Sequence, residues 1–188
     1  MRELALHILD LAENSVSAQS KTINIGAVEN YLTDRLSIWV EDDGKGMDAE
    51  TVALVIDPFV TSRTTRKVGL GIPLLKAAAE MCNGDLLIHS KPGEGTRIDV
   101  DFQQSHLDRM PLGDLQDTYL TLLVAHPEVH WLFTYQLIGN QDENVEFFFD
   151  DGPVKETLDG ISLCEPAVLE YLRQVFREGF STEEQIIH

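Results

Sequence analysis

Four short motifs, rich in glycine and polar residues, follow one another within the first 102 of the 188 residues. In chain order they are Asp10 with Asn14, Asp42-Asp43-Gly44-Lys45-Gly46, Gly69-Leu70-Gly71 and Gly93-Glu94-Gly95-Thr96. Each motif alone has an ordinary explanation: a solvated helix face, an acidic turn, a helix start or a hairpin turn. Their order within one chain is far more specific, and it restricts the fold more than any other feature.

Hydrophobic periodicity places these motifs at the ends of regular elements. Helical spacing predicts helices over 2–18, 48–56 and 69–81, and alternation predicts strands over 22–28, 36–40, 86–89 and 97–102. Segment 57–68 has no clear period and carries hydroxyl and cationic side chains, which indicates a loop. The pattern as a whole predicts an α/β fold.

The first motif could handle phosphate. Asp10 and Asn14 are four residues apart on the polar side of a helix, so their side chains are neighbours. An amide oxygen can ligate Mg²⁺ without adding charge beside phosphates, and a carboxylate one turn away can orient or deprotonate a nucleophile. Taken alone, however, this spacing is more often a solvated helix face.

The second motif could recognise a base. A carboxylate at a strand end, such as Asp42, can accept a hydrogen bond from an exocyclic amine, and glycines allow a flat ring to approach the backbone. Gly44, Gly46 and Ala49 also satisfy the dinucleotide pattern G-x-G-x-x-A. The helix that follows runs into Asp57 and a polar loop, not a strand, which argues against a dinucleotide site.

The third and fourth motifs lie at a helix start and a hairpin turn. Gly69-Leu70-Gly71 opens a helix, whose free N–H groups attract an anion. Arg63 and Lys67 in the preceding loop could neutralise phosphate charge. The run 93–96 joins two strands, and alone it indicates a plain hairpin.

In this order the four motifs resemble the GHKL ATP-binding superfamily, which covers gyrase B, heat-shock-90-type chaperones, histidine kinases and MutL mismatch-repair ATPases. Segment 9–18 resembles the MutL helix that carries a metal-binding Asn, whereas 57–72 and 91–96 resemble the lid and glycine motifs of histidine kinases. The resemblance covers about residues 4–102. It implies a Bergerat-type ATP-binding fold: an α/β sandwich whose mixed, mainly antiparallel sheet has helices on one face.

The resemblance also implies roles at the base and the metal. Asn14 would ligate an Mg²⁺ ion that bridges the ATP phosphates. Asp42 would accept a hydrogen bond from the adenine N6 amine, and Gly46 and Thr96 would join it through an ordered water. Gly44 belongs to the same adenine motif.

A second group of residues would hold the phosphates, again by resemblance. Gly69, Leu70 and Gly71 would supply backbone N–H groups. Arg63 occupies the place where kinases often carry a lid lysine, and Lys67 is a weaker phosphate contact.

The chain departs from the family patterns in ways that bear on the reaction. MutL and gyrase carry Glu where this chain has Asp10, whose side chain is one methylene shorter and reaches less far toward an attacking water. His7 lacks the acidic neighbour usual after a phospho-acceptor, and the given sequence opens with the first helix, so we do not expect a complete histidine kinase with its own dimerisation domain.

These features lead us to expect a stand-alone, histidine-kinase-like domain that binds Mg·ATP and transfers the γ-phosphoryl group to a separate partner protein. Two alternatives stay open. One is a MutL-like ATP hydrolase that acts as a conformational switch, with Asp10 as catalytic base. The other is a non-catalytic ATP sensor. A homodimer is compatible with each of these.

Composition changes after Gln104. Residues 103–188 hold 4 basic and 16 acidic side chains, a net charge of 4 − 16 = −12. We expect an ATP-binding domain over 1–103 and a small acidic α+β extension over 104–188. The extension, with helices near 112–125 and 166–177 around a hairpin, forms either a lobe or an addition to the main sheet. Either it docks a partner or it covers apolar sheet.

Three aromatic residues of the hairpin alternate along one strand. Trp131, Phe133 and Tyr135 share one face with Leu137, which favours a core position over a ligand platform. His126 and His130 are four residues apart, as in some zinc sites. Pro127 lies between them and argues against a continuous helix, so a helix-to-strand junction is favoured.

The net charge of −18 restricts the kinds of partner that the chain can bind. Such a surface repels phosphate backbones and anionic membranes, which argues against a nucleic-acid partner and a membrane partner. The longest uncharged stretch, 129–141, is too short to span a bilayer. Two cysteines far apart, Cys82 and Cys164, suit a reducing compartment, so we expect a cytoplasmic protein.

Overall fold

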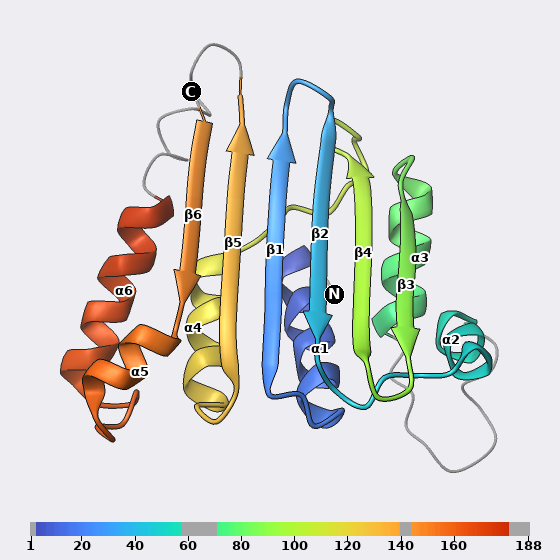
Figure 1. Cartoon of the computed structure of the whole chain (residues 1–188). Coiled ribbons are helices and arrows are strands. Elements are labelled where there is room, and N and C mark those ends of the chain that lie inside the picture. The colour runs from blue at the N-terminus through green and yellow to red at the C-terminus, as the bar shows by residue number, and fades with distance from the viewer. Residues whose placement is uncertain (1–2, 58–70, 140–143, 181–188) are drawn as a thin grey trace.

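The computed structural model describes residues 3–57, 71–139 and 144–180, which form one six-stranded sheet with helices (Figure 1). The strands are β1 (Thr22–Asn30), β2 (Arg35–Asp42), β3 (Asp85–Lys91), β4 (Gly95–Gln103), β5 (His130–Ile138) and β6 (Asn144–Asp150). The helices are α1 (Leu4–Ser17), α2 (Ala49–Ile56), α3 (Gly71–Met81), α4 (Leu115–Ala125), α5 (Gly152–Leu158) and α6 (Pro166–Phe180).

The strands follow the spatial order β3-β4-β2-β1-β5-β6. Neighbouring strands are antiparallel except for β1 and β5, which are parallel. Figure 1 shows α1, α3 and α4 behind the sheet, on the same face. The fold class predicted from the sequence, a mixed and mainly antiparallel sheet with helices on one face, is confirmed.

Alternation along the strands explains why the helices cover one face. In β2, Leu36, Ile38 and Val40 are buried, whereas Ser37 and Trp39 between them are partly exposed. Antiparallel strands commonly bury one face and leave the other in water. Side chains that meet the helices therefore lie on the helix-covered face of the sheet and at the ends of its strands.

The C-terminal residues extend the main sheet, which is one of the two arrangements that the sequence left open. Strand β5 pairs with β1 along its whole length, from Thr22 opposite His130 to Asn30 opposite Ile138. Strand β6 then lies at the edge. The division of the chain into domains over 1–103 and 104–188 stays a prediction.

Aromatic packing holds the added strands to their helices. Trp131, Phe133, Tyr135 and Leu137 are all at most 1% exposed, so the predicted core position is confirmed. Tyr119 of α4 stacks on Phe133 with ring centroids 4.2 Å apart, and Phe176 of α6 meets the edge of the same ring at 6.2 Å. Helices α4 and α6 are therefore fixed on the same face as α1.

Two local features complete the description of this half. His126 is the C-cap of α4 and His130 begins β5, so the predicted helix-to-strand junction is confirmed. Helix α5 was not predicted, because it has only seven residues and begins with Gly152 and Pro153. Within the described ranges, no helix has both the length and the apolar character needed to cross a membrane.

Candidate functional site

The end of β2 brings three of the predicted motifs together. Asp42 is the last residue of β2 and lies opposite Thr96, near the start of β4. Ser15 of α1 donates a hydrogen bond of 2.6 Å to Asp42 Oδ2. Helix α1, the acidic glycine motif and the β3–β4 hairpin therefore meet around one carboxylate.

The carboxylate of Asp42 is held firmly but keeps room for one more donor. Besides Ser15, the Gly44 N–H donates to Oδ1 at 2.9 Å, and the Ser20 hydroxyl lies 3.1 Å from the same oxygen. A carboxylate can accept at about four lone-pair positions. Asp42 is 9% exposed, and the three donors leave one of these positions unused by the described residues. This is the arrangement expected for a residue that reads an exocyclic amine.

Ser15 and Ser20 are site residues that the sequence analysis missed. Ser15 lies on the apolar-to-small side of α1 and is 5% exposed. A small polar residue on a buried helix face needs a hydrogen-bond partner. The position of Ser15 on that face is the sequence feature that could have identified it as a site residue. Ser20 is also buried, and its hydroxyl lies 2.7 Å from the Ser15 carbonyl oxygen.

The glycine motif after β2 is locked onto the β3–β4 hairpin. The Gly93 N–H donates to the Lys45 carbonyl at 2.8 Å, and the Met47 N–H donates to Ser90 Oγ at 2.8 Å. Gly46 has a φ of +64°, and a Cβ there would lie 1.8 Å from the Lys91 carbonyl oxygen. Gly46 is therefore required for a close approach of two backbones, in addition to the water-mediated role that the resemblance implies.

A hollow of about 460 Å³ adjoins this hairpin and reaches Asp42 and Thr96. The hydroxyl of Thr96 lies 2.9 Å from Ser90 Oγ, which fixes its position at the rim. Gly44 is also in a crowded position, because a Cβ there would lie 2.5 Å from Ser20 Oγ. The base-side residues predicted from the sequence, Asp42, Gly44, Gly46 and Thr96, thus share one location.

Asp43, the second acidic residue of the motif, has a structural task. Burial disfavours its charged form, but hydrogen bonds from the Thr22 and Lys21 backbone N–H groups outweigh this and hold the pKa of Asp43 below its ordinary value. These bonds, 3.0 and 2.7 Å long, tie the motif to the start of β1. The sequence analysis assigned Asp43 no role.

Helices α1 and α3 meet at the other side of the site. A Cβ at Gly71, the first residue of α3, would lie 1.7 Å from Asp10 Oδ2. The half-buried carboxylate of Asp10 therefore lies directly against the start of α3. Asn14, one turn later on α1, is exposed. The structure brings Asp10, Asn14 and Gly71 to one region.

Four predicted phosphate contacts lie outside the described residues: Arg63, Lys67, Gly69 and Leu70. Their roles stay predictions. Among the described residues, the start of α3 lies on the phosphate side of the site, and a helix presents free N–H groups to an anion at its start.

A second polar cluster lies at the ends of β5 and β6. His130 Nε2 is 2.8 Å from Asp150 Oδ1 and 3.7 Å from Asp151 Oδ1, a spacing that a metal ion could bridge. However, the buried Asp151 is already paired with Lys155 at 2.6 Å and accepts a hydrogen bond from the Trp131 N–H. We therefore interpret the cluster as an ion-pair network that joins the start of β5 and the end of β6 to α5.

Comparison with known proteins bears on the first half of the chain. Residues 2–106, more than half of the chain, match the family described as Histidine kinase-, DNA gyrase B-, and HSP90-like ATPase. The "Non-motile and phage-resistance protein" of Caulobacter vibrioides is 32% identical over 111 residues, which cover 54% of this chain and 13% of that protein. "Sensor histidine kinase YvrG" of Bacillus subtilis is 28% identical over 99 residues, or 50% of this chain and 17% of that protein.

The fold also has a solved counterpart. A structure titled "Crystal Structure of N terminal domain of a DNA repair protein" matches with a TM-score of 0.51 at 12% identity, over 86% of this chain and 57% of that chain. This likeness extends past residue 106 and supports the fold alone. The motif order, the geometry around Asp42 and the match over residues 2–106 agree, and the chain belongs to the family of histidine kinase-, DNA gyrase B- and HSP90-like ATPases.

Proposed function

We propose that the chain binds Mg·ATP, with adenine at Asp42, and transfers the γ-phosphoryl group to a separate protein in the cytoplasm. The observation that carries the binding part is the Asp42 carboxylate, which is oriented by Ser15 and the Gly44 N–H and keeps an acceptor position open. The glycine loop beside it allows a flat ring to approach. Membership of the ATPase family supports ATP binding, whereas transfer to a partner goes further than the family alone.

The described residues fit a nucleotide that lies from Asp42 toward α3. The base would occupy the region of Asp42, Gly44, Gly46 and Thr96, and the phosphates would point to the start of α3 at Gly71. Mg²⁺ held by the exposed amide oxygen of Asn14 would neutralise the phosphate charge. By resemblance, Gly69, Leu70, Arg63 and Lys67 would add contacts to the phosphates.

Phosphoryl transfer depends mainly on positioning and charge neutralisation, not on a strong base. The similarity to a sensor histidine kinase supports this reaction class for the present chain. Two cysteines that form no disulfide, Cys82 and Cys164, support a cytoplasmic location.

One observation favours the hydrolase as a second candidate. Asp10 lies against Gly71, at the side of the site where the phosphates are expected. A carboxylate there could orient a water molecule toward the γ-phosphate. ATP hydrolysis would then change contacts with a partner. A chain that only senses ATP would bind it without either reaction.

Binding is tested with an Asp42→Asn variant and calorimetric titration of ATP in the presence of Mg²⁺. An amide retains one acceptor oxygen but loses the charge and disturbs the bonds to Ser15 and Gly44, so we expect ATP affinity to fall by about tenfold or more. Asp117→Asn, an exposed change in α4, is the matched control and should leave affinity unchanged. Equal affinity of Asp42→Asn and wild type would refute the adenine assignment.

The reaction is tested by incubating the purified chain with Mg·ATP and quantifying ADP and free phosphate over hours. The kinase proposal expects ATP binding with little free phosphate from the chain alone. Steady release of ADP and phosphate in equal amounts, lost in an Asp10→Asn variant, would establish the hydrolase instead.

A further inference from the structure

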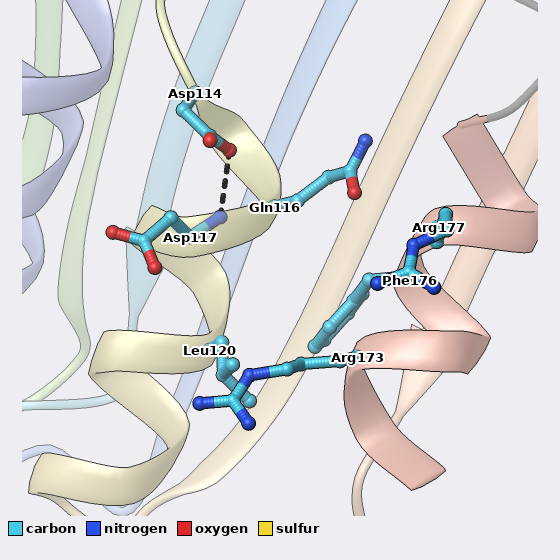
Figure 2. A pocket seen from close by; sticks show the side chains of 7 residues that line it. All are labelled: Asp114, Gln116, Asp117, Leu120, Arg173, Phe176 and Arg177. Atoms are coloured by element: carbon cyan, nitrogen blue, oxygen red, sulfur yellow. Dashed lines mark hydrogen bonds between the residues drawn. The ribbon is translucent and has the colours of Figure 1, made fainter. Parts of the chain in front are cut away.

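Helices α4 and α6 enclose a hollow of about 150 Å³, which we call the α4–α6 hollow (Figure 2). Acidic side chains line it at the start of α4, arginines line it on α6, and two apolar side chains complete the lining. This volume is that of roughly five water molecules at liquid density, so it suits a free amino acid better than a helix of another protein. Neither the sequence motifs nor the nucleotide site accounts for this hollow.

Two arginines of α6 form one wall of the hollow. Arg173 and Arg177 are one helical turn apart and exposed, and Figure 2 shows Arg173 reaching toward α4. The other two basic residues of segment 103–188 have partners inside the protein, because Arg109 donates to two backbone carbonyls and Lys155 pairs with Asp151. Neighbouring guanidinium groups suit a carboxylate, which can accept hydrogen bonds from both.

The wall on α4 is acidic and stays apart from the arginine wall. Asp114 is the N-cap of α4, and its Oδ1 accepts a hydrogen bond of 2.8 Å from the Asp117 N–H, which fixes its carboxylate. Among the residues that the structure describes, Arg173 pairs with Glu170 of its own helix at 4.0 Å, and no ion pair joins it to Asp114 or Asp117. The opposite charges therefore face the hollow without closing it.

The floor of the hollow is apolar and belongs to the core. Leu120 of α4 and Phe176 of α6 line it and are 9% and 1% exposed. The ring of Phe176 meets those of Phe133 and Phe149 with centroids 6.2 and 4.9 Å apart, so the floor is held in place by the sheet. An apolar group that packs on this floor would leave water, which favours binding.

We propose that the α4–α6 hollow binds a free α-amino acid with an apolar side chain. The carboxylate of the ligand accepts hydrogen bonds from Arg173 and Arg177, its ammonium group donates to the two α4 carboxylates, and its side chain lies on the floor. The two signs of charge select this class of ligand. A simple anion would leave the acidic wall without a donor, and a simple amine would leave the arginines without an acceptor.

The proposal goes beyond nucleotide chemistry and can be tested on the full chain without nucleotide. L-leucine is titrated into the protein, and the heat of binding is measured by calorimetry. Leucinamide lacks the carboxylate, N-acetyl-leucine lacks the ammonium group, and glycine lacks the apolar side chain, so each removes one of the three contacts. We expect each of these to bind at least about tenfold more weakly than leucine.

The matched variants are Arg173→Gln in the hollow and Lys21→Gln just before β1. Both replace an exposed cation by the same neutral side chain, so they change the net charge equally. We expect leucine to bind wild type and Lys21→Gln alike, and Arg173→Gln about tenfold more weakly. Arg173→Lys keeps the charge but not the planar fork of donors, so it should restore affinity only in part.

Three results would overturn the proposal: no binding of leucine, equal affinities for leucine, leucinamide and N-acetyl-leucine, or equal affinity of Arg173→Gln and Lys21→Gln for leucine. Binding that needs the carboxylate but not the ammonium group would overturn it too, because it would identify a site for simple anions. Circular dichroism of both variants confirms that the comparison is between folded proteins.

Discussion

The hydroxyl of Ser15 should stabilise the fold by holding Asp42, and its removal gives a measurable cost. Ser15 and Asp42 are 5% and 9% exposed, and they share a hydrogen bond of 2.6 Å. A hydrogen bond to a charged group contributes about 1.5–3 kcal/mol. Alanine favours the helix over serine by about 0.5 kcal/mol, so the net loss in Ser15→Ala is about 1–2.5 kcal/mol. For a chain of this size that lowers Tm by roughly 2–10 °C.

The matched control is Ser17→Ala, two residues further along α1, where the serine is exposed. It keeps the gain in helix propensity and loses no buried hydrogen bond, so its stability should equal or slightly exceed that of wild type. Urea unfolding followed by circular dichroism gives both free energies of unfolding, and an ATP titration should show weaker binding only for Ser15→Ala. Equal free energies of unfolding for the two variants would refute the reasoning that Ser15 supports the carboxylate.

Two further predictions concern the loop and the strand ends. Gly46→Ala places a methyl group against the Lys91 carbonyl at a φ of +64°, so the loop should leave the hairpin. The strain and the two lost hydrogen bonds together cost about 2–5 kcal/mol of folding free energy. Both ATP affinity and Tm should therefore fall. An unchanged ATP affinity would show that the contact between this loop and the hairpin does not matter for binding. At the other site, the hydrogen bonds from His130 and the Gly152 N–H hold the pKa of Asp150 below its ordinary value of 3.8. A carboxyl with a depressed pKa contributes stability above pH 3.8 that is lost as the pH falls through its folded value. Asp150→Asn should therefore be less stable than wild type near pH 6, with a gap that narrows below pH 4; a gap independent of pH in urea unfolding would contradict this.

The sequence predicted which residues lie together at the end of β2, but it did not predict the pairing of strands. Asp42, Gly44, Gly46 and Thr96 could be grouped because the order of their motifs resembles that of a known family, and the structure places all four near the end of β2. Ser15 was missed because a serine within a helix has many uses. Ser15 has a role in the site only through its hydrogen bond to Asp42, which lies 27 positions further along the chain.

Strand pairing depends on contacts that periodicity does not encode. The alternation of Trp131, Phe133 and Tyr135 predicts that one face of a strand is buried, but it does not say which strand lies alongside. The parallel pairing of β5 with β1 joins residues more than 100 positions apart.

The C-terminal half supplies hydrogen-bond partners for the helix that carries Asp10 and Asn14. Glu3, the N-cap of α1, makes no capping bond with its side chain; instead the Leu4 and Ala5 N–H groups donate to the Pro111 and Leu112 carbonyls at 3.0 and 2.8 Å. Further along α1, Glu13 lies 2.9 Å from His126 Nε2, at the end of α4.

Both termini of α1 are thus tied to residues beyond 103, and β5 lies beside β1. Displacement of α4 or β5 would therefore disturb contacts that hold the helix carrying Asn14 and Asp10. Helix α5 is joined to β5 in turn, because Lys155 pairs with Asp151 and the Trp131 N–H donates to Asp151. Whether these contacts link the C-terminal elements to nucleotide binding is a question of coupling free energy, which ATP titrations of variants that break the contacts measure directly.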